Sequence, residues 1–347
     1  MKDTPASREG ERIMAFREIV DQDHAILLLR EALRLGRISH AYLFVGPEGV
    51  GKKAVAISFA QALNCLNADG FDACGSCPSC KKIAGGSHPD VRVTAPQGES
   101  LKIDQIRALR QEAMYPPFEG RWKVYILEDA EKMTAEAANS LLKVLEEPPE
   151  RVVWILLATS TVSLLPTIVS RCQMVRFTLL PTALIKRALV ERFNLPEAQA
   201  RFLAALAAGR IGQAITWALT KEALAERETM LDFLSRVESM DALERLLAAE
   251  ELGKQKEKLS DLLDIAYLWY RDLLVWSQAR DEDLLFNLDK KETIAKIAPS
   301  FSPRELQRRI VLIEEAKEAL RRNANPRLVL ETLLLRMMSP EEAIRPG

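Results

Sequence analysis

A short apolar run that leads into a glycine-rich turn constrains the fold of this chain more than any other feature. The turn has the Gly-x4-Gly-Lys spacing of a Walker A loop and contributes four candidate nucleotide-binding residues: Gly46, Gly49, Gly51 and Lys52. In such a loop, backbone N–H groups surround the phosphates and the lysine reaches their outer oxygens. The pattern predicts a buried strand over 41–45 and a helix over 54–63 whose N-terminus faces the anion.

The residue after the lysine departs from this motif. A Walker A loop has Ser or Thr there, because the hydroxyl group binds Mg²⁺ beside the phosphates, whereas this chain has Lys53. A second ammonium group can attract phosphate but cannot bind a metal ion, so Lys53 stays a candidate nucleotide-binding residue. The pattern indicates a phosphate-binding loop that lacks some of the residues required for ATP hydrolysis. The alternative is a tight strand-to-helix turn that binds no ligand.

A second apolar run ends in two carboxylates. Residues 124–127 precede Glu128 and Asp129, as in a Walker B motif, where the first acid supports Mg²⁺ and the second orients the attacking water. The order of the two acids is the reverse of the expected Asp-Glu, and the alternative is that they cap the following turn. Thr159, which follows the apolar run 152–158, completes the candidate nucleotide-binding residues.

Strand-like and helix-like patterns alternate through the first half of the chain. Strands are expected over 41–45, 91–93, 124–127, 152–158 and 174–177, and helices over 13–38, 54–63, 103–114 and 134–147. Strands rich in Val, Ile and Leu that alternate with helices predict an α/β fold, with a parallel sheet flanked by helices. From Leu180 onward no β signal of comparable strength returns, so the remainder is predicted to be helical.

Four cysteines lie within sixteen residues after the helix expected over 54–63. They are Cys65, Cys74, Cys77 and Cys80. Four thiolates at this spacing can hold one ion tetrahedrally, with Gly70, Gly75 and Pro78 supplying turns, and zinc is the leading interpretation. A four-cysteine site leaves no open coordination position, so the metal is expected to be structural. An iron–sulfur cluster and free buried thiols are the alternatives, although the continuation typical of ferredoxins is missing.

Composition restricts the classes of function that are open to the chain. Its 347 residues predict two or three domains, and 48 basic residues balance 49 acidic ones, so tight independent binding to DNA is not expected. The N-terminus has no apolar segment typical of a secretory signal, and no apolar run approaches the length of a membrane span. The clustered cysteines fit a reducing cytoplasm better than a secreted disulfide framework.

Several of these motifs together resemble the AAA+ subunits of the bacterial sliding-clamp loader of DNA polymerase III, most closely the delta-prime branch. The resemblance rests on Ile38-Ser-His-Ala-Tyr-Leu-Phe-x-Gly before the P-loop, the four-cysteine insertion, Leu141-Leu-Lys-Val-Leu-Glu-Glu-Pro-Pro149, Ser170-Arg-Cys172 and Asn325-Pro-Arg-Leu-x-Leu-Glu331. Matches run from about residue 13 to residue 338. Their combination is specific, although a P-loop alone would not be.

This resemblance implies a domain organisation. The expected parts are an N-terminal tail (1–12), an AAA+ P-loop module (13–179) with a zinc insertion at about 64–83, a small helical lid domain (180–221) and an all-helical collar domain for oligomerisation (222–347). It also implies the partners, which are the gamma/tau and delta subunits in a five-subunit ring and, indirectly, the sliding clamp and primed DNA. No association with a membrane is implied.

Three departures distinguish the chain from the ATP-hydrolysing subunits gamma and tau. Lys53 replaces the metal-binding hydroxyl, Glu128 and Asp129 invert the acid pair, and Gly212 stands where those subunits carry an arginine that senses the γ-phosphate. The alternative at this last position is that the nearby Arg210 partly substitutes for that arginine. The resemblance therefore implies a non-motor component of the polymerase III holoenzyme in DNA replication, with little or no ATPase activity of its own. DNA-directed DNA polymerase activity belongs to the complex, and binding of ATP or ADP stays open.

The resemblance also implies a role for Arg171 in Ser170-Arg-Cys172, as an arginine finger that acts on nucleotide held by a neighbouring subunit. The alternative is that Arg171 is only a surface or domain-bridging arginine. Two other functions compete with the leading one. One is an ATP-hydrolysing motor subunit of the gamma/tau type, and the other is a zinc-dependent DNA-binding module, which the balanced charge disfavours.

Overall fold

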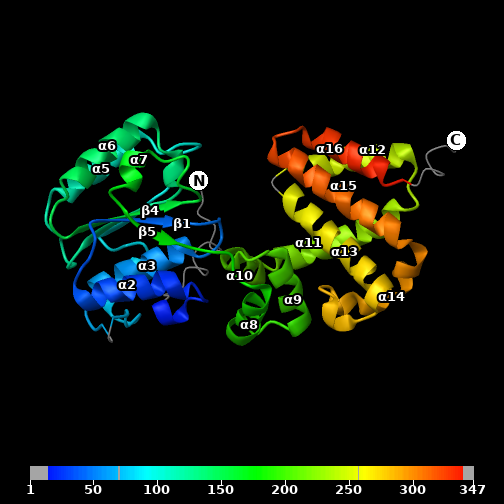
Figure 1. The fold of residues 1–347 in the computed structure, drawn as a ribbon, viewed down its shortest axis with the longest axis horizontal. Coiled ribbons are helices and arrows are strands. Elements are labelled where there is room, and N and C mark those ends of the chain that lie inside the picture. Colours follow the sequence, from blue (N-terminus) through cyan, green and yellow to red (C-terminus); the bar gives the residue numbers. More distant parts are fainter. Residues whose placement is uncertain (1–14, 69–70, 257, 339–347) are drawn as a thin grey trace. The chain divides into compact units, whose positions relative to one another are not determined.

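Five parallel strands form one sheet in this computed structural model, which describes residues 15–68, 71–256 and 258–338 (Figure 1). The spatial order of the strands is β2-β3-β4-β1-β5. Their bounds are β1 (Ala41–Val45), β2 (Val91–Thr94), β3 (Lys123–Leu127), β4 (Val152–Ala158) and β5 (Gln173–Arg176). The predicted α/β class with a parallel sheet is confirmed. The expected N-terminal tail, 1–12, lies outside the described residues.

Helices cover both faces of this sheet (Figure 1). Because successive side chains of a strand point to opposite faces, Tyr42 and Phe44 of β1 pack with one set of helices and Leu43 with the other. The first set is α2 (Asp23–Leu35), α3 (Lys52–Asn64) and α4 (Pro78–Ala84), and the second is α5 (Ile103–Ala113), α6 (Ala135–Glu146) and α7 (Pro166–Val169). Two 3₁₀ turns, η1 (Phe16–Glu18) and η2 (Ala130–Lys132), complete this part.

The prediction of one helix over 13–38 is wrong. The described part of that segment contains η1 and α2, separated by a break at Asp21 and Gln22, whose φ angles are 57° and 66°. The break lets the buried side chain of Gln22 donate to the carbonyl oxygens of Thr178 (2.8 Å) and Val50 (3.3 Å). Gln22 therefore joins the P-loop to the chain that follows β5, and these long-range bonds override the helical periodicity of the sequence.

The chain divides into two compact units. One contains Met1–Leu184 with Gly209–Gln213, and the other contains Ile185–Ala208 with Ala214–Gly347. Among the described residues beyond 181 there are helices and no strands, as predicted. The α-helices are α8 (Thr182–Phe193), α9 (Glu197–Leu206), α10 (Ile211–Thr220), α11 (Glu222–Val237), α12 (Ala242–Gly253), α13 (Leu259–Ala279), α14 (Lys291–Ile297), α15 (Pro303–Arg321) and α16 (Pro326–Arg336). The 3₁₀ turns are η3 (Glu282–Leu284), η4 (Leu288–Lys290) and η5 (Ala298–Ser300).

The core of the second unit is built around the long helix α13, which packs against α11 and α15, while α12 packs against α16. Trp269 and Tyr270 of α13 are buried, so both serve as core residues. No helix in the described ranges combines the length and the apolar character that crossing a membrane requires.

A fully buried carboxylate also organises this unit. Asp272 of α13 accepts hydrogen bonds from the backbone N–H groups of Phe286 and Asn287 and pairs with the Arg271 guanidinium at 2.7 Å. The amide of Asn287 adds a further bond to the carboxylate, and Arg227 donates to the carbonyl oxygen of that amide. The carboxylate thus holds the segment after η3 against α13.

We expect Asp272→Ala to lower the free energy of unfolding by about 3–5 kcal/mol, because it leaves buried donors without their acceptor. A matched control is Glu228→Ala, which removes an exposed ion pair with Lys290 and is expected to cost less than about 1 kcal/mol. Urea unfolding followed by circular dichroism measures both. Equal losses for the two variants would contradict the role given to Asp272.

Candidate functional site

The P-loop has the backbone geometry that its glycines predict. Gly51 precedes α3 with a φ of 98°, a left-handed conformation that side chains disfavour. Gly46 lies so close to the end of β5 that a Cβ atom there would come within 2.4 Å of the Phe177 carbonyl oxygen. The loop therefore runs from β1 into the N-terminus of α3, where it can present N–H groups to an anion.

Lys52 lies on this loop as the motif predicts. Its ammonium group donates to the carbonyl oxygens of Gly46 and Pro47, the latter at 2.8 Å. Burial lowers the pKa of Lys52, and the nearby carboxylates of Glu131 and Glu48 act in the opposite direction. These acids favour the charged form of the lysine, which is the form that attracts phosphate.

Lys53 and Glu128 are brought together at the same end of the sheet. The ammonium nitrogen of Lys53 lies 3.1 Å from Oε1 of Glu128, and the two side chains are 42% and 26% exposed. In a P-loop ATPase these two positions supply the Ser or Thr hydroxyl and the acid that hold Mg²⁺. An ion pair therefore stands where that motif places a metal, and these residues do not fit Mg²⁺.

The two remaining predicted residues have partners of their own. Asp129, in a left-handed conformation at the start of η2, forms an ion pair with Lys132 at 2.9 Å, and no side-chain cap is formed. Thr159 donates from its backbone N–H and its hydroxyl group to Oε1 of Glu131. Sequence reasoning missed Glu131. Its position three residues after Glu128, at the same end of the sheet, is the signal that could have indicated it.

The segment Gly209–Gln213 belongs to the same compact unit as the P-loop and contacts it directly. The backbone N–H of Gly212 donates to the carbonyl oxygen of Gly49 at 2.7 Å. A Cβ atom on Gly212 would lie 3.1 Å from that oxygen, tighter than ordinary contact. Glycine at this position therefore permits a close approach to the loop, and the sensor arginine expected of a motor subunit is absent from the sequence here.

The four predicted metal ligands converge. The sulfur atoms of Cys65, Cys74, Cys77 and Cys80 all lie within 4.8 Å of one another. A tetrahedral zinc site with Zn–S bonds of about 2.3 Å has S···S edges of about 3.8 Å, so the cluster is close to the required size. Of the predicted turn residues, Gly70 lies outside the described residues. Pro78 is the first residue of α4 and not part of a turn, because proline suits the first position of a helix.

Burial raises the pKa of Cys65 and Cys80, whereas for Cys74 and Cys77 hydrogen bonds from the backbone outweigh burial and lower the pKa. The N–H groups of Cys74, Cys77 and Cys80 donate to the sulfurs of Cys65, Cys74 and Cys77 at 3.3, 3.3 and 3.4 Å. Burial opposes ionisation of Cys74, yet N–H donors from Ser76 and Cys77 lower its pKa to about 6. Because metals bind the thiolate, this donor set fits zinc.

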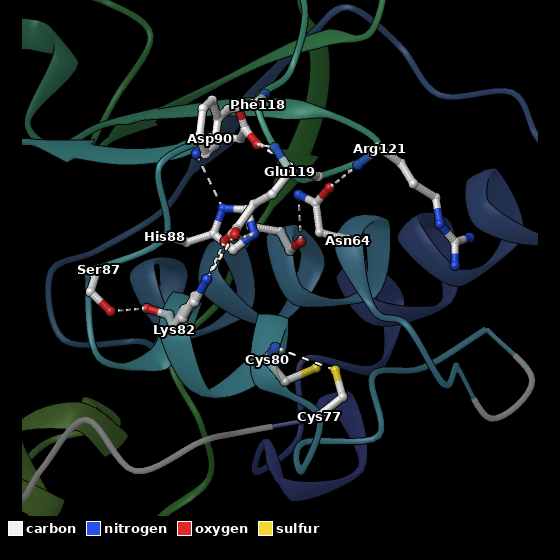
Figure 2. Close-up of polar contacts among 12 residues, drawn as sticks. Asn64, Cys77, Cys80, Lys82, Ser87, His88, Asp90, Phe118, Glu119 and Arg121 are labelled. Carbon is white, nitrogen blue, oxygen red and sulfur yellow. Dashed lines mark hydrogen bonds and ion pairs between the residues drawn. The ribbon is translucent and has the colours of Figure 1, made fainter.

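The cysteine cluster is tied to a loop that precedes β3 (Figure 2). Asn64, at the end of α3, accepts from the backbone N–H of Arg121 at 2.8 Å, and the Arg121 guanidinium donates to the carbonyl oxygen of Cys65 at 2.8 Å. Lys82 of α4 forms an ion pair with Glu119 at 2.7 Å. A change in the cluster is therefore expected to reach residues 118–122.

The same loop is held from its other side by a buried acid. The carboxylate of Asp90 accepts the backbone N–H groups of Phe118, Glu119 and Gly120 at 2.7 to 2.8 Å (Figure 2). Burial would raise the pKa of Asp90, but these three donors outweigh it and lower the pKa. The carboxylate therefore contributes stability above its ordinary pKa of about 3.9, which is lost as the pH falls through the lowered value.

We expect Asp90→Ala to accelerate hydrogen exchange of the amides at 118–120 by about tenfold or more at neutral pH, because three donors lose a charged acceptor. Asp104→Ala is the matched control, since it removes an exposed carboxylate of α5 that pairs with Arg107 and leaves the bonds of the loop in place. Hydrogen exchange followed by mass spectrometry measures both variants. Unchanged protection in Asp90→Ala would contradict this account of the loop.

Arg171 follows the short helix α7. Its guanidinium donates to the Thr167 carbonyl oxygen at 3.0 Å and forms an ion pair with Glu146, at the end of α6, at 2.9 Å. The side chain is 35% exposed. A partly exposed guanidinium that is paired with a single surface carboxylate can exchange that partner for another anion, because such ion pairs are weak.

Two family models and several known proteins match this chain. The family model described as "DNA polymerase III, delta subunit" matches residues 21–181, and "DNA polymerase III, delta subunit, C terminal" matches residues 221–339. DNA polymerase III subunit delta' of Bacillus subtilis (strain 168) is 33% identical over 317 residues, which are 90% of this chain and 95% of that protein. This chain belongs to the delta-prime family of DNA polymerase III clamp-loader subunits.

This chain is also similar to tau subunits of DNA polymerase III. It is 28% identical to DNA polymerase III subunit tau of Bacillus subtilis (strain 168), over 94% of this chain and 62% of that protein. It is 38% identical to subunit tau of Escherichia coli (strain K12), over 46% of this chain and 25% of that protein. The match therefore spans less than two thirds of each tau protein.

Proposed function

We propose that this chain is the non-motor delta-prime subunit of the clamp-loader complex and helps to place the sliding clamp on primed DNA during replication in the cytoplasm. The observation that carries the non-motor part is the ion pair between Lys53 and Glu128. Hydrolysis by a P-loop protein needs Mg²⁺ bridging the phosphates, and neither an ammonium group nor a carboxylate engaged by it provides that ion's ligands. Gly212 adds support, because it supplies no cation for the γ-phosphate.

Arg171 is proposed to act on the nucleotide of a neighbouring motor subunit. Its side chain lies just after α7 and is partly exposed, which supports this role, and so does its weak ion pair with Glu146. A phosphoryl group in transfer offers a stronger, bidentate partner than one carboxylate does. This chemistry needs nothing from the chain's own P-loop, so a subunit without hydrolytic activity can still accelerate hydrolysis in the ring.

The expected domains become part of the same proposal. An AAA+ module (13–179) would carry Arg171, a lid (180–221) would follow, and a collar (222–347) would join gamma/tau and delta. Cys65, Cys74, Cys77 and Cys80 would hold a structural zinc ion. Zinc there would stabilise the insertion without taking part in chemistry, since all four coordination positions are filled by protein.

A motor subunit of the gamma/tau type is the second candidate. The similarity to Bacillus subtilis tau over 94% of this chain favours it. The two candidates differ in whether the chain hydrolyses ATP by itself. The ion pair at the metal position and the glycine at the sensor position weigh against the motor subunit.

Reconstitution with candidate gamma/tau and delta subunits tests the proposed function. The expected results are a stable complex containing this chain at a fixed stoichiometry and clamp loading on primed DNA that requires the chain. Native mass spectrometry measures the first result and a clamp-loading assay the second. A complex that forms and loads clamps equally well without the chain would overturn the proposal.

A further inference from the structure

Three large apolar side chains are exposed to solvent where the chain leaves α5 and approaches β3. Met114, Tyr115 and Phe118 are 72%, 70% and 84% exposed. Single exposed apolar residues are common on protein surfaces, whereas a group of them marks a site of protein–protein contact. We propose that the segment 114–118, together with a basic groove beside it, docks into an apolar pocket bordered by acidic residues on a partner protein.

The backbone of this segment is fixed at both ends. The N–H of Tyr115 donates to the Glu112 carbonyl oxygen, in the last turn of α5, at 3.3 Å. The N–H of Phe118 donates to the Asp90 carboxylate at 2.7 Å. Two prolines lie between these residues, and their rings restrict the backbone further. A partner therefore meets apolar side chains on a preorganised backbone, which lowers the entropy cost of binding.

A groove between α5 and α6 adjoins the segment. Its volume is about 530 Å³, and Met114 belongs to its lining, so the groove and the apolar segment form one surface. Arg107, Arg110 and Lys143 also line the groove, and Glu147 is the one carboxylate among its lining residues. The lining therefore carries an excess of positive charge.

Ion pairs within the chain preserve this excess. The acids nearest to the segment, Glu112 and Glu119, each pair with a cation of the same chain, at 3.6 and 2.7 Å. Arg110 instead donates to the neutral hydroxyl group of Ser140 at 2.9 Å, so its charge is not cancelled there. An acidic surface on the partner complements this charge, and such complementarity favours encounter and specificity.

The apolar side chains point to a protein as the partner and not to DNA. Phosphates are contacted by cations and hydrogen-bond donors, and they gain nothing from Met114 or Phe118. Exposed aromatic residues and methionine are instead typical of the centres of protein–protein interfaces.

The cysteine cluster supports this surface from behind. The Arg121 guanidinium donates to the Cys65 carbonyl oxygen at 2.8 Å. Lys82 of α4 pairs with Glu119, which directly follows Phe118 (Figure 2). The cluster can therefore fix the position of the docking segment without touching the partner.

Photo-cross-linking of the full-length chain tests the proposal. A chain with p-benzoylphenylalanine in place of Phe118 is mixed in turn with purified sliding clamp, delta, gamma/tau and primed DNA, irradiated, and analysed by mass spectrometry. The expected result is a cross-link to one of the three proteins, at a site where acidic residues border apolar ones. Cross-links to DNA alone, a cross-linked site without acidic residues, or no cross-link to any of the three proteins would overturn the proposal.

Substitutions measure the contribution of the surface to affinity for the cross-linked protein. Phe118→Ser is expected to weaken binding by about tenfold or more, because buried aromatic residues carry much of the binding energy of an interface. Lys143→Glu is expected to weaken binding as well and to reduce its dependence on salt. Leu27→Ser is the matched control, since Leu27 of α2 is 67% exposed and lies outside the surface. Biolayer interferometry measures all three variants, and equal losses in Leu27→Ser and Phe118→Ser would also overturn the proposal.

The proposal concerns the same chain as the proposed function but requires neither Arg171 nor assembly of the ring. Each binding assay uses one partner at a time. Failure of this inference is therefore distinguishable from failure of clamp loading in the reconstituted complex.

Discussion

Arg171→Ala is expected to reduce ATP hydrolysis and clamp loading by the reconstituted complex by about tenfold or more at the affected site. The reason is that a guanidinium group can donate two parallel hydrogen bonds to phosphate oxygens as charge develops during transfer. Folding and ring assembly are expected to be unchanged, because the side chain is partly exposed and tied only to Thr167 and Glu146. Steady-state hydrolysis with primed DNA measures the effect.

Three further variants separate an arginine finger from a structural arginine. Arg171→Lys keeps the charge but not the bidentate geometry, so it is expected to recover little activity. Glu146→Ala removes the partner in the ion pair and is expected to leave activity close to that of the unmodified complex. Lys52→Ala is expected to have a much smaller effect than Arg171→Ala. Full activity in Arg171→Ala, or loss of activity in Lys52→Ala, would reverse these roles and favour the motor subunit.

Loss of the metal is expected to have the second large effect. We predict one zinc ion per chain and its release in Cys77→Ser, because three thiolates leave the tetrahedral site incomplete. The insertion is expected to unfold locally, since much of its order would come from metal binding. The sheet is expected to stay largely intact. Elemental analysis measures the metal, and hydrogen exchange over 64–83 measures the local order.

Cys172→Ser is the matched control for the metal. Cys172 lies outside the four-cysteine cluster, so this variant is expected to keep one zinc ion per chain. The ties through Arg121 and Glu119 add a further expectation, which is that Cys77→Ser also loosens residues 118–122. Iron in place of zinc, or no metal in protein purified without a chelator, would refute the assignment.

The sequence predicted the sheet well for a physical reason. Buried parallel strands read as apolar runs because helices cover both faces, and all five strands lie within a few residues of the predicted positions. The Walker A spacing likewise indicated the strand, loop and helix that the structure contains. The cysteine spacing indicated the cluster, since a metal site of this kind is encoded by nearby residues.

Contacts between residues that are far apart in the sequence could not be predicted from such local patterns. The pairing of Lys53 with Glu128 joins positions far apart in the chain, and each appeared in the sequence only as a separate departure from a motif. The break at Gln22 depends on its bonds to Thr178, which no periodicity encodes. The ion pair between Arg171 and Glu146 could not be predicted either, because the pattern of the helix that contains Glu146 indicates only which residues form its apolar face.

ATP turnover by the isolated chain, with Mg²⁺ and primed DNA, tests the central claim most directly. If the Lys53–Glu128 ion pair excludes the metal, turnover is expected to be absent or far below that of a motor subunit measured in the same assay. Turnover comparable to that of the motor subunit would contradict the account of this chain as a non-motor member of the clamp loader.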